Sequence, residues 1–82
     1  MRSFSEWLKS QTALTVNVIN DTNSRLNRVK RIIGDVDSDD LNVLLEKLEN
    51  EEAFLSLSRT VKSQLRRALK LYCEFRRSAL NE

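Results

Sequence analysis

Residues 57–75 read LSRTVKSQLRRALKLYCEF and have the pattern of one long amphipathic helix. Apolar side chains recur at steps of four, three, four and three residues, which places them on a single helix face. The stripe consists of Val61, Leu65, Ala68, Tyr72 and Phe75, with Leu69 beside it. We therefore expect a helix from about Ser58 to about Ser78 that buries this face against the rest of the chain.

A second stretch, residues 15–34, repeats this pattern. It reads TVNVINDTNSRLNRVKRIIG, and its stripe steps by three, four, three and four residues. The stripe consists of Ile19, Thr22, Leu26, Val29 and Ile33. We expect a helix from about Asn17 to Ile33 that ends at Gly34, because glycine readily adopts the left-handed backbone found after helix ends.

A capping signal predicts a short helix at the N-terminal end of the chain. Ser3 and Glu6 have the spacing of a capping box, in which two side chains satisfy free amides at a helix start. Phe4, Trp7 and Leu8 then share one face of the helix. We expect this helix to begin near Ser3 and to pack Trp7 into the core, rather than to present it to a partner.

A third helix is expected from about Asp39 to Leu48, because aspartates suit the positive N-terminal end of a helix. Its buried stripe consists of Leu41, Leu44, Leu45 and Leu48. Apolar residues within 53–57 predict one further short turn. The fold class predicted is all-α, a compact bundle of four main helices with a short fifth turn, in one domain over residues 1–82. The predicted core includes Trp7, Ile19, Leu26, Val29, Ile33, Leu44, Leu48, Leu65, Ala68, Tyr72 and Phe75.

The composition excludes several classes of function. The 82 residues include no histidine, one glycine and one cysteine, Cys73. The commonest general base, glycine-rich phosphate loops and zinc clusters are therefore missing, and we expect no enzyme, no cofactor and no metal site. Four aspartates lie close together in a segment that lacks the glycine and the terminal glutamate of a calcium-binding loop. We therefore interpret the segment as an acidic loop that leads into a helix. The four aspartates are Asp35, Asp37, Asp39 and Asp40.

The composition also indicates the cellular compartment and the roles of Tyr72 and Cys73. No apolar run approaches the ~20 residues of a membrane span. A single cysteine suits a reducing environment, so we expect a cytoplasmic protein. We interpret Cys73 as an inert thiol and Tyr72, on the buried stripe, as a packing residue rather than a nucleophile.

Charge is segregated along the chain. The net charge of +2 divides into +4 over residues 1–34, −7 over residues 35–52 and +5 over residues 53–82. This order allows two basic helices to lie side by side, away from an acidic one.

Both long helices carry cations outside their apolar stripes. On the last helix they fall within an arc of roughly 80°, and only Glu74 adds negative charge there. They are Arg59, Lys62, Arg66, Lys70 and Arg77. On the second helix Arg28 and Arg31 lie opposite the core, with Arg25 and Lys30 on the flanks. Such stripes are often simply solvated, but the shortage of acid also suits contact with nucleic-acid phosphates.

The order of these elements resembles the N-terminal core-binding domain, of SAM-like helical fold, of tyrosine recombinases and phage integrases. The resemblance runs from about Phe4 to Phe75 and is carried by the two stretches quoted above, most of all by 57–75. It implies a protein of a phage or mobile element that grips duplex DNA as one half of a clamp. The DNA contacts it implies are Arg25, Arg28, Arg31, Arg59, Lys62, Arg66 and Lys70. The family's catalytic residues belong to a second domain that these 82 residues do not include, so no strand cleavage is expected from this chain alone.

Two functions from different classes follow. As a DNA-binding module, the protein should present one continuous basic surface, with the acidic third helix facing elsewhere. The cations of that surface would be Arg28, Arg31, Arg59, Lys62, Arg66 and Lys70. The alternative is a protein-interaction module, either a homodimer or a regulator or inhibitor of a recombinase-like or other partner. It would use the acidic third helix or the spare apolar residues Val16, Val36, Leu71 and Leu80. Neither function involves a membrane or a small-molecule substrate.

Overall fold

The computed structural model describes residues 3–11, 15–37 and 40–80, and helices make up most of these ranges. They are, in chain order, α1 (Phe4–Gln11), α2 (Val16–Ile33), α3 (Leu41–Glu49), α4 (Glu52–Leu55) and α5 (Arg59–Leu80). No strand occurs in the described ranges. The all-α prediction is confirmed, and the short turn expected after the third helix is α4.

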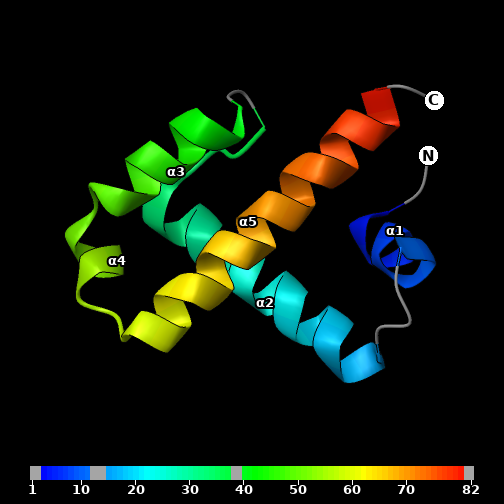
Figure 1. Ribbon diagram of the computed structural model, residues 1–82, viewed down its shortest axis with the longest axis horizontal. Coiled ribbons are helices and arrows are strands. Elements are labelled where there is room, and N and C mark those ends of the chain that lie inside the picture. Colours follow the sequence, from blue (N-terminus) through cyan, green and yellow to red (C-terminus); the bar gives the residue numbers. More distant parts are fainter. Residues whose placement is uncertain (1–2, 12–14, 38–39, 81–82) are drawn as a thin grey trace.

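The two long helices form the frame of the molecule. α2 and α5 cross one another, with α5 in front of α2 in the view of Figure 1. α3 and α4 lie on one side of this crossing and α1 lies on the other (Figure 1). The amphipathic stripes of α2 and α5 face each other because both must be removed from water, and the shorter helices cover the apolar surface that remains.

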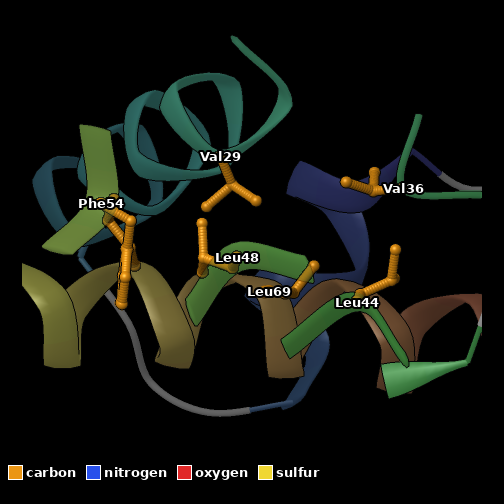
Figure 2. Close-up of a cluster of buried hydrophobic side chains, with 7 residues drawn as sticks. Val29, Val36, Leu44, Leu48, Phe54 and Leu69 are labelled. Atoms are coloured by element: carbon orange, nitrogen blue, oxygen red, sulfur yellow. The ribbon is translucent and has the colours of Figure 1, made fainter. Parts of the chain in front are cut away.

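The core has two parts, one on each side of the crossing. The first part joins α2, α3, α4 and α5 through Val29, Val36, Leu44, Leu48, Phe54, Leu65 and Leu69. Figure 2 shows six of these side chains converging from the surrounding helices and from the connection between α2 and α3. The second part joins α1 to the long helices through Phe4, Trp7, Leu8, Ile19, Leu26 and Ala68.

Short polar side chains cap the starts of α1, α2 and α5. The backbone N–H of Glu6 donates to Oγ of Ser3 at 3.2 Å, which confirms the predicted start of α1. At α5 the N–H of Val61 donates to Oγ of Ser58 at 3.2 Å. α2 begins one residue before the predicted Asn17, because the hydroxyl of Thr15 accepts from the N–H of Val18 at 3.3 Å. Each cap satisfies an amide that has no partner within its own helix.

A glycine ends α2 and an aspartate caps the start of α3, as their positions in the sequence suggested. Gly34 has a φ of 82°, and its N–H donates to the carbonyl of Lys30 at 2.8 Å. At the other end Asp40 caps α3, since its Oδ1 accepts from the N–H of Val43 at 3.0 Å. The predicted helix start at Asp39 lies outside the described residues.

Two predictions about the core need correction. Val36, expected as a spare apolar residue for a partner, is 1% exposed and belongs to the core. Ile33, Tyr72 and Phe75 are only half-buried, although their helix phase predicted full burial. Leu8, Phe54 and Leu69 are fully buried, in agreement with the apolar helix faces and the short turn predicted to contain them.

Val36 is buried because α5 holds the loop that carries it. Nη1 of Arg76 donates to the carbonyl of Val36 at 2.7 Å, and Nη2 donates to the carbonyl of Asp37. The hydroxyl of Tyr72 also donates to Oδ1 of Asp37 at 2.5 Å. We call Arg76, Tyr72, Val36 and Asp37 the loop clasp. It fixes residues 36–37 against the C-terminal half of α5.

Candidate nucleic-acid interface

The first two thirds of α5 form the most cationic part of the structure. Between Arg59 and Cys73 the sequence contains five cations and no acidic residue. Arg59, Arg67 and Lys70 are exposed, while Lys62 and Arg66 are half-buried. We call these five residues the α5 cation row. Arg77, also exposed, lies further along the same helix.

Arg66 is the member of the row that contacts the acidic helix. Its Nη2 lies 2.9 Å from Oε1 of Glu49 on α3. Its guanidinium carbon also lies 5.2 Å from the centre of the Phe54 ring, and its Nε is buried without a hydrogen-bond partner among the described residues. The expectation that the acidic third helix faces away from these cations is wrong at this position.

Helix geometry explains this contact. At 100° per residue, Arg66 lies only about 60° around α5 from Leu69. Leu69 is fully buried against residues of α3 and α4. One edge of the cation row therefore borders the core on the α3 side, and Arg66 reaches across this edge to Glu49.

The cations of α2 are distributed over several sides of that helix. Arg28 and Arg31 are exposed and lie opposite the buried stripe of α2. Because this stripe packs toward α5, these two arginines point away from α5, and the arrangement does not favour one surface continuous with its cation row. Lys30 lies with its Nζ 5.4 Å from the centre of the Tyr72 ring.

Arg25 is the predicted α2 residue that lines the same groove as a cation of α5, Arg67. It is half-buried and lines a groove of about 240 Å³ between the two long helices. The groove is lined by Val18, Thr22 and Arg25 of α2 and by Gln64, Arg67, Ala68 and Leu71 of α5. We call it the α2–α5 groove. Arg67 was not among the predicted DNA contacts, because it lies about 60° outside the predicted arc of cations. Its place next to Arg66 in the sequence could have indicated it as a further cation of this helix.

Tyr72 and Cys73 on α5 both hold their protons more tightly than the free side chains do. Burial, followed by the hydrogen bond to Asp37, raises the pKa of Tyr72 from 10.0 to about 12. Burial also raises the pKa of the Cys73 thiol, against the opposing effect of Arg76. Both groups are therefore protonated near neutral pH, and a protonated thiol or phenol is a poor nucleophile.

The described residues contain no group of three or more His, Cys, Asp or Glu side chains that could hold a metal ion. None of the helices in the described ranges is both long enough and apolar enough to cross a membrane.

Comparison with known proteins gives no relative for this chain. No protein-family model matches it, and neither a curated protein nor a solved structure matches it. The resemblance to the core-binding domain of tyrosine recombinases therefore stays a prediction.

Proposed function

We propose that the protein binds duplex DNA through the α5 cation row, with little dependence on base sequence. The observation that carries this proposal is a run of fifteen residues, from Arg59 to Cys73, with five cations and no acid. Among the described residues, only Arg66 of these five cations pairs with a carboxylate. The other four are available for an external anion.

The length of the row suits a duplex. Arg59 and Lys70 are separated by about 16 Å along the helix axis, at 1.5 Å per residue. A DNA duplex presents a phosphate charge every ~1.7 Å along its own axis, so several phosphates lie within reach of such a row. Ser63 and Gln64 stand between the cations and add uncharged donors of the kind that also contact phosphates and base edges.

Arg25, which lies at the α2–α5 groove, belongs to the proposed interface, whereas Arg28 and Arg31 do not. These last two arginines point away from the cation row, so we expect them to act through net charge more than through direct contact. The resemblance to one half of a DNA clamp supports weak binding, since a single half covers only part of a duplex. Non-specific binding of this type has a Kd of about 10⁻⁴ to 10⁻⁶ M at physiological salt.

A titration of a fluorescent 20-base-pair duplex, followed by anisotropy, tests the proposal. We expect Lys70→Glu and Arg59→Glu each to weaken binding, because each puts a negative charge into the row. Lys9→Glu on α1 makes the same charge change at an exposed position outside the row and should weaken binding less. Equal losses for all three variants would show that only net charge matters and would refute the proposed interface.

A second candidate function, protein interaction, rests on another observation. Val16 and Val18 at the start of α2 are 64% and 39% exposed. Val16 was among the spare apolar residues predicted for a partner, whereas Leu71 is half-buried at the groove and the side chain of Leu80 lies outside the described residues. A measurement of mass in solution over a range of concentrations tests this candidate.

A further inference from the structure

The α2–α5 groove is lined by both apolar and positively charged side chains. Val18, Ala68 and Leu71 supply the apolar surface, and Val18 remains 39% exposed. Arg25 and Arg67 lie at the same groove, and neither pairs with a carboxylate among the described residues. The groove is therefore suited to an apolar side chain that has carboxylates beside it.

The outer side of α3 presents such a side chain. Val43 is 39% exposed, although it lies in the middle of an amphipathic helix. Asp40 and Glu46 are each one helical turn from Val43, one before it and one after it, and both are exposed. α3 carries a single cation, Lys47, within a segment whose net charge is −7. We call Asp40, Val43 and Glu46 the α3 ridge.

We propose that the protein associates with itself head to tail, the α3 ridge of one copy docking in the α2–α5 groove of the next. Val43 would enter the groove between Arg25 and Arg67, and its flanking carboxylates would lie beside the two guanidinium groups. This inference does not rest on DNA binding, because the α3 ridge and the apolar lining of the groove take no part in the proposed DNA interface. Arg25 and Arg67 belong to both surfaces, so DNA and a second copy would compete for these two arginines.

The two surfaces differ, so the contact is heterologous. An association of this kind does not pair two identical patches, and it continues to further copies unless the rotation between neighbours closes a ring. The contact is small and partly ionic, so we expect it to be weak and to be screened by salt.

Sedimentation equilibrium of the whole chain, at low and at high salt, is the first test. At low salt the average mass should rise steadily with protein concentration, and high salt should reduce the rise. A strictly monomeric mass at millimolar concentration and low salt would overturn the proposal.

A charge exchange identifies the surfaces. Arg67→Glu and Glu46→Arg should each weaken self-association roughly tenfold, because each places like charges across the contact. In a one-to-one mixture the two variants should associate with each other, because the groove that gains negative charge from Arg67→Glu then meets the ridge made positive by Glu46→Arg. Failure of the mixture to associate better than either variant alone would contradict the assignment.

An uncharged variant separates this proposal from DNA binding. Val18→Ser removes apolar surface from the groove without changing any charge, and because Val18 is partly exposed the fold should persist, which a thermal melt checks. We expect this variant to self-associate several-fold more weakly, while its affinity for duplex DNA stays at the parent value.

If self-association is unchanged by Val18→Ser and by Arg67→Glu, another surface mediates it and the proposal is wrong. If a different acidic protein binds the groove while the chain itself stays monomeric, the second copy is likewise rejected as the occupant.

Discussion

Nη2 of Arg66 and Oε1 of Glu49 lie 2.9 Å apart, so the acidic helix α3 borders the cation row of α5. The two side chains are 40% and 50% exposed, and a pair this accessible contributes at most about 1 kcal/mol to stability. Under the proposed function, the main effect of this pair is on DNA binding rather than on stability. Glu49 neutralises one arginine of the proposed DNA interface, at the edge where the row meets the core.

Removing this carboxylate should release Arg66 for phosphate. We expect Glu49→Gln to raise affinity for duplex DNA roughly two- to fivefold, and Glu49→Lys to raise it further. The free energy of unfolding should change by less than about 1 kcal/mol. Glu52→Gln, which removes an exposed carboxylate of α4, is the matched control in the anisotropy titration. A loss of affinity in Glu49→Gln would show that the ion pair holds Arg66 in the orientation that binds.

The loop clasp makes a prediction about stability. Arg76→Met keeps much of the aliphatic side chain but removes the donors to the Val36 and Asp37 carbonyls. Since these carbonyls lose charge-assisted hydrogen bonds, we expect a cost of about 1–3 kcal/mol in urea unfolding. Amide exchange should also become faster at residues 35–37. Arg77→Met changes the neighbouring exposed arginine and should stay within about 0.5 kcal/mol of the parent; equal losses in the two variants would argue against the clasp.

Truncating Phe54 or Phe75 to alanine should lower the free energy of unfolding by different amounts, because the two side chains differ in burial. Phe54 is fully buried, so Phe54→Ala should cost about 3–5 kcal/mol. Phe75 is half-buried among the rings of Phe4, Trp7 and Tyr72, so the same change there should cost less. Leu65→Ala, at 1% exposure, should cost about 2–5 kcal/mol. Chemical denaturation gives all three values, and a larger loss at Phe75 than at Phe54 would mean that the burial described for these rings is wrong.

The phenol of Tyr72 should make stability depend on pH in the alkaline range. Its pKa is about 12 in the folded protein, against an ordinary value of 10.0. Because the folded state holds the proton more tightly, this contribution to stability is complete below pH 10.0 and is lost as the pH rises towards about 12. Urea unfolding at pH 8, 10, 11 and 12 should show the decline. Tyr72→Phe should reduce it; an unchanged decline would assign it to other groups.

Periodicity was sufficient to predict the helices, because each apolar stripe is a local property of the sequence. Ser3, Gly34 and Ser58 lie at helix ends for local reasons as well, and all three were anticipated. Val36 was not, since its burial depends on Arg76, which lies forty residues away in the sequence. A loop valine carries no periodic signal that would reveal such a contact.

The candidate site was predicted less completely than the fold. Exposed cations such as Arg59 and Lys70 follow from helix phase alone. The pairing of Arg66 with Glu49 does not, because it depends on which edge of α5 lies against α3. The groove shared by Arg25 and Arg67 likewise depends on how two long helices cross.

The salt dependence of DNA binding tests the central claim most directly. The affinity of the protein for a fluorescent duplex should be measured across a series of salt concentrations, together with that of Lys70→Glu. If the cation row and Arg25 engage four to six phosphates, the logarithm of the association constant should fall against the logarithm of salt concentration with a slope of roughly −4 to −5. Lys70→Glu should bind more weakly and give a shallower slope. No binding at low salt, or a Lys70→Glu variant with the parent's affinity and slope, would contradict the proposed function.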